Sequence, residues 1–191
     1  MNILLVYGTT EGQTRKIAEF IKPELEKTSH TITLCDATNH PVCPEGFDAV
    51  IICASLHIGR YQTAVYDYIK KHHAMLNKVH SAFISVSLTA AGDDAEEWKE
   101  LHDITTKFLG ACQWKPRLTE YVAGALLYTE YDYFKKTIMR MIAKKEGRPA
   151  TGDTEYTDWN KLRDFLKKFI SEWTPSPQTV QAMETDQEAV A

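Results

Sequence analysis

Short apolar runs alternate along the chain with segments of helical periodicity. Continuous apolar runs are typical of strands that are buried on both faces. They predict strands at 3–7, 31–34, 49–54, 81–87 and 121–125. Apolar residues that recur every three or four positions predict helices at 14–27, 61–73, 95–111 and 158–173, the first with Pro23 inside its apolar stripe. This alternation predicts an α/β fold with a doubly wound, five-stranded parallel sheet of strand order 2-1-3-4-5.

Two segments do not fit this alternation. The stretch 126–156 is too long for an ordinary connection in an α/β unit, and it contains a helical pattern of its own at about 133–145. We predict a helical insertion there, between the last strand and the last helix. The final stretch, 175–191, is polar and lacks periodicity, which predicts a disordered tail after a domain spanning 1–174.

Composition narrows the possible classes of protein. The chain has 191 residues, of which 43% are hydrophobic and 25% charged, as expected of one domain with its own core. A net charge of -4 argues against a general nucleic-acid binder. No apolar run reaches the length of a membrane span, and the N-terminus lacks the features of a signal peptide, so we expect a cytoplasmic protein. The spacing of Cys35, Cys43, Cys53 and Cys112 predicts reduced thiols, without a disulfide framework or a metal site.

A loop rich in hydroxyl groups follows the first predicted strand. It reads GTTEGQT from Gly8 to Thr14 and leads into a helix, whose N-terminus presents backbone N–H groups to an anion. Gly12 lets a ligand approach the backbone closely. The loop lacks the lysine of a P-loop and the third glycine of a dinucleotide fingerprint, so ATP, GTP and NAD are disfavoured. We expect it to bind a terminal monophosphate through neutral donors and the helix dipole.

Two further loops are expected at the same edge of the sheet. The loop after the third central strand, 54–63, carries His57 and Tyr61, and the loop after the next strand, 87–94, is rich in small residues. A planar heteroaromatic group between them would find a stacking partner and backbone donors. His57 and Tyr61 are candidates for proton transfer at such a ring.

At this point the motifs become recognisable. GTTEGQT resembles the FMN-phosphate loop of the flavodoxin superfamily, with Glu11 where a small polar residue is more usual. The segments ASLHIGRYQTA, SAFISVSL, KFLGACQWKP, YVAGALLYTEYDYF and EYTDWNKL are similar to the menaquinone-dependent protoporphyrinogen oxidase family, which has a flavodoxin-like fold. This resemblance extends to about Trp173. It implies an FMN-dependent oxidoreductase of heme biosynthesis that oxidises protoporphyrinogen IX and passes the electrons to a quinone.

The resemblance also implies which residues bind FMN. The phosphate would be held by Thr9, Thr10, Glu11, Gly12, Gln13 and Thr14. One side of the flavin would be covered by Ser55, Leu56, His57, Ile58, Gly59 and Tyr61. The other side would be covered by Ser87, Leu88, Thr89, Ala90, Ala91 and Gly92.

The insertion departs from the family, whose members carry a strongly basic insertion. Here its beginning is acidic, with Glu130 and Asp132, although a basic face remains that could lie on the inner face of the cell membrane. The alternative function is a flavodoxin-type electron carrier that serves a redox partner protein. A receiver domain is disfavoured, because the first and third strands end in Tyr7-Gly8 and Ala54-Ser55 rather than in aspartates.

Overall fold

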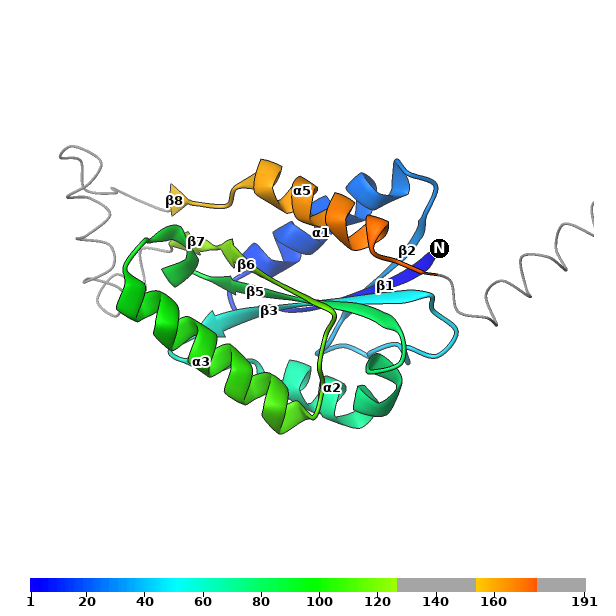
Figure 1. The fold of residues 1–191 in the computed structure, drawn as a ribbon, viewed down its shortest axis with the longest axis horizontal. Helices are drawn as coiled ribbons and strands as arrows, with labels where there is room; N and C mark the ends of the chain where they lie inside the picture. The colour runs from blue at the N-terminus through cyan, green and yellow to red at the C-terminus, as the bar shows by residue number, and fades with distance from the viewer. Residues whose placement is uncertain (127–153, 175–191) are drawn as a thin grey trace, which may run out of the picture.

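The computed structural model describes residues 1–126 and 154–174, and in them a parallel sheet lies between two layers of helices (Figure 1). The sheet is formed by β1 (Asn2–Gly8), β2 (Thr31–Asp36), β3 (Ala49–His57), β5 (His80–Ser87) and β6 (Leu118–Ala123). The strand order is β2-β1-β3-β5-β6, with every neighbouring pair parallel. The predicted fold class and the predicted order of the five strands are therefore confirmed.

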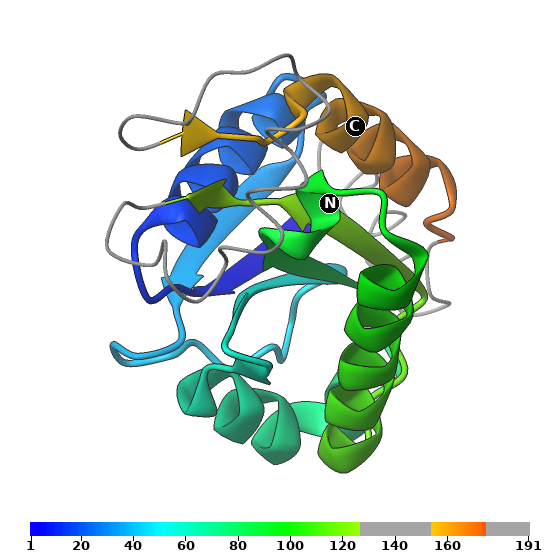
Figure 2. The same ribbon diagram turned by 90° about the vertical axis from the view of Figure 1, so that its left-hand side faces the viewer.

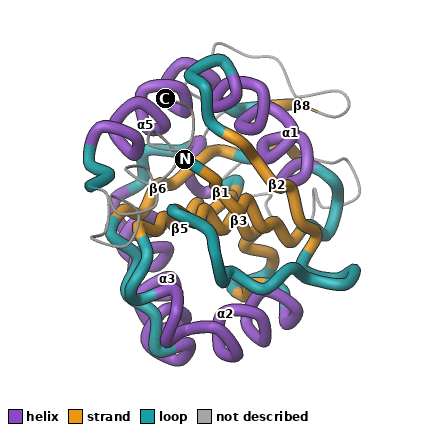
Figure 3. The backbone as a smooth tube through the Cα atoms, turned by 90° about the vertical axis from the view of Figure 1, so that its right-hand side faces the viewer, coloured by secondary structure: helices purple, strands orange, loops and turns teal. Residues whose placement is uncertain are grey.

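The helices cover both faces of the sheet, with α1 and α5 on one side and α2 and α3 on the other (Figure 3). Their bounds are α1 (Gln13–Glu26), α2 (Thr63–Leu76), α3 (Ala95–Cys112) and α5 (Trp159–Ser171), with a short 3-10 turn, η1 (Thr89–Ala91). The Asp94 side chain caps α3 by accepting from two backbone N–H groups, and Asp158 caps α5 in the same way. Pro23 lies inside α1 without ending it.

The core is divided by the sheet into two halves, because successive side chains of a strand point to opposite faces. Ile3 and Leu5 of β1 pack with α1 and α5, whereas Leu4 and Val6 pack with α2 and α3. All four side chains are fully buried. This explains why the strand reads as a continuous apolar run.

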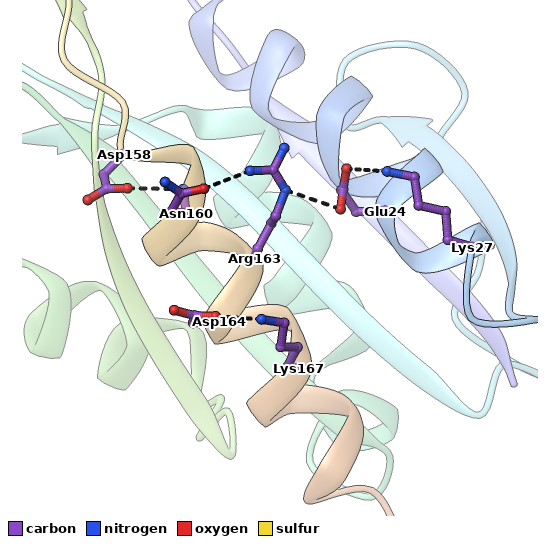
Figure 4. A network of polar contacts seen from close by, with 7 residues as sticks. All are labelled: Glu24, Lys27, Asp158, Asn160, Arg163, Asp164 and Lys167. Carbon is purple, nitrogen blue, oxygen red and sulfur yellow. Dashed lines mark hydrogen bonds and ion pairs between the residues drawn. The ribbon is translucent and has the colours of Figure 1, made fainter.

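Polar contacts join α1 to α5, the two helices on the same face of the sheet (Figure 4). Arg163 Nε donates to Glu24 Oε2 at 3.3 Å, and Arg163 Nη1 donates to Asn160 Oδ1 at 2.8 Å. The guanidinium also lies 5.0 Å from the ring centroid of Phe20. Because the Arg163 side chain is 41% exposed, its ion pair contributes at most about 1 kcal/mol, and the apolar contacts dominate this interface.

One local difference from the prediction lies after the third strand. Residues 55–59 were expected to form a loop, but β3 continues to His57 and pairs antiparallel with β4 (Arg60–Tyr61). Ile58 and Gly59 form the turn with φ of 48° and 70°. Two successive residues with positive φ match the right-handed twist of a tight hairpin, but a β-branched residue rarely adopts this conformation, so the sequence carried little signal for the turn.

The segment after β6 leaves and rejoins the described structure as a short ribbon. β7 (Ala125–Leu126) pairs antiparallel with β8 (Thr154–Glu155), at the end of the sheet where the strands finish (Figure 2). The predicted helix at about 133–145 and the predicted tail at 175–191 lie outside the described residues. A search of the described helices finds none with the length and apolarity needed to cross a membrane.

Candidate functional site

A narrow cleft lies at the carboxyl ends of the central strands, the end of the sheet seen in Figure 2. Its volume is about 50 Å³. It is lined by Thr9, Thr10, Glu11, Gln13, Thr14, Ser55, Leu56, His57, Val86, Ser87, Leu88, Gly124 and Ala125. The structure thus brings together residues from all three loops that the sequence placed at one edge.

The first loop is shaped by Gly12. This residue precedes α1 with a φ of 92°, and none of the described side chains caps the helix there. A Cβ atom added at Gly12 would meet nothing within 4 Å, so the backbone lies open to a ligand. The Gly12 N–H donates to Thr9 Oγ1 at 2.8 Å, which holds the loop closed on itself. The uncapped helix N-terminus favours an anion because its first N–H groups and its dipole both point outward.

Thr14 provides a direct indication that a polar ligand belongs in the cleft. Its side chain is fully buried and lines the cleft, yet its hydroxyl has no hydrogen-bond partner among the described residues. A buried hydroxyl without a partner costs about 1–3 kcal/mol, so a native structure normally satisfies it. An anionic oxygen that accepts from Thr14 would remove this cost.

Gln62 bridges two of the loops that form the cleft. Its Nε2 donates to Thr10 Oγ1 at 3.0 Å and to Ser55 Oγ, while its buried Oε1 has no partner in the part of the chain that the structure describes. Gly8 gives this region its close packing, because a Cβ atom there would lie 2.3 Å from Val65 Cγ2 in α2. Sequence reasoning missed Gln62. The signal that could have identified it is a polar side chain directly before a predicted helix, in a loop at the edge of the sheet where a ligand was expected.

Gln13 has a different environment from the one expected of a phosphate-binding residue. Its side-chain amide donates to Glu155 Oε1 and to Thr157 Oγ1, both at 2.9 Å. Lys16 also pairs with Glu155, at 2.6 Å. Partial burial acts to raise the pKa of Glu155, but the hydrogen bonds from Lys16 and Gln13 outweigh it and hold this pKa below its ordinary value. These contacts hold the segment 155–157 against the start of α1.

The second loop contributes only its first half to the cleft. Ser55, Leu56 and His57 line it, whereas Ile58 forms the hairpin tip with 52% of its surface exposed. Gly59 borders a separate hollow on the other side of the hairpin. His57 is half-buried at the edge of the cleft, where the sequence placed it.

Tyr61 lies in the core and does not line the cleft, although the sequence suggested that it would cover a ligand. It is 8% exposed, and its hydroxyl forms hydrogen bonds of 2.7 Å with Ser85 Oγ and with Thr105 Oγ1. Burial raises the pKa of Tyr61 to about 12, despite these two bonds. The physical reason is the β3–β4 hairpin, which turns the chain back so that Tyr61 packs beneath β3 and β5.

The third loop is also divided. Ser87 and Leu88 line the cleft, whereas Ala90 and Ala91 border a different hollow of about 460 Å³ formed with β6 and the segment 155–162. Thr89 begins the η1 turn, and the Gly92 carbonyl accepts from Trp98 Nε1 at 2.9 Å. This loop is thus held from outside by α3.

The end of β6 completes the cleft. Gly124 and Ala125 line it, and the Gly124 N–H donates to the Ser87 carbonyl at 3.0 Å. A Cβ atom at Gly124 would lie 3.4 Å from Val86 Cγ1, so a glycine keeps this edge open. Sequence reasoning did not include these residues, although every parallel strand that ends at this edge is a candidate. Within residues 1–126 and 154–174, no group of three metal-ligating side chains occurs.

Comparison with known proteins agrees with this architecture. A family model described as a flavodoxin domain matches residues 4–153. The protoporphyrinogen IX dehydrogenase [quinone] of Escherichia coli K12 is 32% identical over 182 residues, covering 93% of this chain and 98% of that protein. A protein of the same description from Leishmania major is 33% identical, covering 88% of this chain and 74% of that protein.

Among solved structures, oxidised flavodoxin 1 of Bacillus cereus matches with a TM-score of 0.54 at 14% identity, covering 91% of this chain and 100% of that chain. At this identity the match supports the fold alone. The likeness of the sequence motifs to the flavodoxin superfamily and to its protoporphyrinogen oxidases is confirmed by the relatives. The chain therefore belongs to the flavodoxin domain family.

Proposed function

We propose that the protein is an FMN-dependent oxidoreductase that oxidises protoporphyrinogen IX and passes the electrons to a quinone. The observation that carries this proposal is the 32% identity to the Escherichia coli protoporphyrinogen IX dehydrogenase [quinone] over 93% of the chain. The similarity spans almost the full length of both proteins, and so it includes more than a shared cofactor domain.

The residues of the cleft fit FMN. The open backbone at Gly12, the uncapped start of α1 and the buried hydroxyl of Thr14 suit the phosphate. Thr9 and Thr10 would add neutral hydroxyl groups from the same loop, and the backbone N–H groups of Glu11 and Gln13 would face the phosphate, with Gly12 leaving room for it. Ser55 to His57 on one side, and Ser87 and Leu88 on the other, would flank the flavin ring.

Gln62 joins two residues of the cleft lining, Thr10 and Ser55, by hydrogen bonds from its side-chain amide. We expect Gln62 to turn aside when FMN enters, exchanging its bond to Thr10 for one to the cofactor. Rotation of the side chain would also let the buried Oε1 atom accept from a hydroxyl or N–H group of the cofactor.

FMN supplies the redox chemistry when it is bound, namely hydride acceptance and onward electron transfer. The chain contributes binding, orientation and exclusion of water. We propose His57 as the residue that moves a proton at the edge of the cleft, because its half-buried ring lies on the loop that flanks the flavin. We assign no such role to Tyr61, whose hydroxyl is committed to Ser85 and Thr105.

A second candidate function is that of a flavodoxin-type electron carrier for a redox partner protein. The observation that favours it is the match of residues 4–153 to the flavodoxin domain model. The two candidates differ in turnover, because only the enzyme oxidises a porphyrinogen with a quinone and no other protein. The proposed site of action is the cytoplasmic face of the membrane, where a quinone is accessible.

The first test is a titration of the purified chain with FMN, followed by flavin fluorescence. Gly12→Asp is expected to weaken FMN binding at least about tenfold, because it places a carboxylate beside the phosphate. Gly46→Asp is a matched control: Gly46 also has a positive φ, 82°, with open space at its Cβ position, but it precedes the start of β3 and does not line the cleft. Equal losses in both variants, or no FMN binding by the unmodified chain, would contradict the proposed cofactor site.

The second test measures oxidation of protoporphyrinogen IX by the FMN-loaded protein with a naphthoquinone as acceptor. Porphyrin formation that depends on the quinone supports the enzyme. FMN binding without such turnover would instead favour the electron carrier. His57→Ala is expected to alter the pH dependence of turnover while leaving FMN affinity within about twofold, and an unchanged pH profile would remove His57 as the proton carrier.

A further inference from the structure

The hollow bordered by Gly59 lies on the other side of the β3–β4 hairpin from the cleft. Its volume is about 420 Å³, within the range of small-molecule sites. It is formed by the hairpin, the first turn of α2 and the C-terminal half of α3. Nothing in the cofactor site described above uses it.

The floor of this hollow is aromatic and apolar. Tyr66, Ile104 and Phe108 line it, with the buried ring of Tyr61 beneath. The Phe108 ring lies 4.4 Å from the Tyr61 ring and 6.2 Å from the Tyr66 ring, measured between centroids. Such a surface favours the face or edge of a flat apolar ring system.

Two cations border this floor from different elements. Arg60 comes from β4 and Lys107 from α3, and both are exposed. Neither forms an ion pair in the described part of the chain, and no carboxylate occurs among the described residues that line the hollow. Other surface cations of this protein, such as Lys16 and Lys161, do have acidic partners. Cations that have no acidic partner among the described residues, placed around an apolar floor, favour a ligand that is both apolar and anionic.

The hairpin connects this hollow to the cofactor cleft. Leu56 and His57 line the cleft, and Gly59 and Arg60 line the hollow. The tip between them is Ile58, an apolar side chain with 52% of its surface exposed. A ligand anchored in the hollow would pass the exposed apolar side chain of Ile58 on its way to the cleft.

From this arrangement we infer that the hollow binds the carboxylate-bearing edge of the tetrapyrrole substrate. Arg60 and Lys107 would pair with its carboxylates, the aromatic floor would contact the pyrrole rings, and Ile58 would support the macrocycle toward the flavin. This inference rests on the proposed function, since it names the place where that substrate binds. Arg60 and Lys107 are specificity-determining residues here, with no part in the redox step.

The test uses the FMN-loaded protein and the stable product protoporphyrin IX, whose fluorescence and visible absorption report binding without turnover. Arg60→Gln and Lys107→Gln are each expected to raise the Kd about three- to fivefold, and the double variant about tenfold or more. The Kd should also rise with salt. Protoporphyrin dimethyl ester, which lacks both charges, should bind the unmodified protein and the double variant equally.

Lys71→Gln is the matched control, because Lys71 is an exposed cation of α2 that does not line the hollow. It should leave the Kd within about twofold, and all variants should bind FMN as the unmodified protein does. In turnover, the double variant should raise KM for the porphyrinogen and leave kcat unchanged.

Three results would overturn the site. The first is an unchanged Kd for protoporphyrin IX in the double variant, and the second is an equal loss of affinity in Lys71→Gln. The third is a Kd for the dimethyl ester that rises in the double variant as much as the Kd for the free acid. Porphyrinogen oxidation with an unchanged KM in the double variant would overturn the site and leave the proposed function intact. Conversely, the expected binding pattern without turnover would keep the site and overturn the proposed enzyme.

Discussion

Replacing Tyr61 by phenylalanine tests the position of this side chain with a single oxygen atom. The structure places the Tyr61 hydroxyl in a buried chain of hydrogen bonds, at 2.7 Å from both Ser85 Oγ and Thr105 Oγ1. A role in covering the flavin would make the same change felt in cofactor binding. The structure instead predicts a loss of stability with FMN affinity unchanged.

The expected loss of stability follows from which hydroxyl donates in each of these hydrogen bonds. Thr105 Oγ1 donates to the Leu101 carbonyl at 2.8 Å, so it must accept from Tyr61, and Tyr61 must accept from Ser85. Ser85 is fully buried and Thr105 is 1% exposed, so water cannot replace the lost partner. Leaving the Ser85 donor unsatisfied costs about 1–3 kcal/mol, and we expect the free energy of unfolding to fall by about 2 kcal/mol.

Urea unfolding of the FMN-loaded protein measures this loss, which should also lower Tm by about 4–8 °C in a chain of this size. In a Ser85→Ala background the orphaned donor is absent, so Tyr61→Phe should cost about 1 kcal/mol less there. A change in stability of less than about 0.5 kcal/mol, or a change in the Kd for FMN of more than about threefold, would refute this placement of the Tyr61 hydroxyl.

Three shorter predictions follow from the same packing. Gly8→Ala should destabilise the fold by about 1–3 kcal/mol in urea, because its Cβ would lie 2.3 Å from Val65 Cγ2; an unchanged midpoint would contradict this. Burial lowers the pKa of His80 in the folded protein. As the pH drops through 6.5 the unfolded state therefore binds more protons than the folded state, and the free energy of unfolding should fall. His80→Gln keeps a donor to the Phe169 carbonyl and should make this fall shallower in urea midpoints measured against pH. Of the four cysteines, Cys43 is exposed and the other three are buried. A thiol reagent should therefore label one cysteine of the native protein, and the other three only after unfolding.

The architecture was accessible from the sequence because its signals are local. The run Ile3–Tyr7 is buried on both faces of the sheet and therefore reads as continuous apolar residues. The apolar stripes of the helices follow the same logic, and the end of each predicted helix lies within three residues of the observed one. The family likeness rests on motifs such as GTTEGQT, which is one continuous loop at the start of the site.

The site was predicted less completely, because its side chains are placed by contacts between distant segments. Tyr61 was expected at the ligand, but the strained turn at Ile58 sends it into the core. Gln62, its neighbour, was not expected to contribute, but it bridges Thr10 and Ser55 across the cleft. No local pattern distinguishes these two adjacent positions, since the direction of each depends on how β4 pairs with β3.

The sequence by itself determined the order of strands and helices, the sheet topology that follows from it, and the chemistry of the loop before α1. Periodicity and glycine position are enough for these features because each reflects burial or backbone conformation within a few residues. Only the tertiary structure decided that Glu155 clasps Gln13 and Lys16 across 142 and 139 positions of the chain, and that Arg60 and Lys107 border one apolar hollow. These contacts depend on the packing of whole elements against one another, which fixes the directions of side chains that no local pattern can specify.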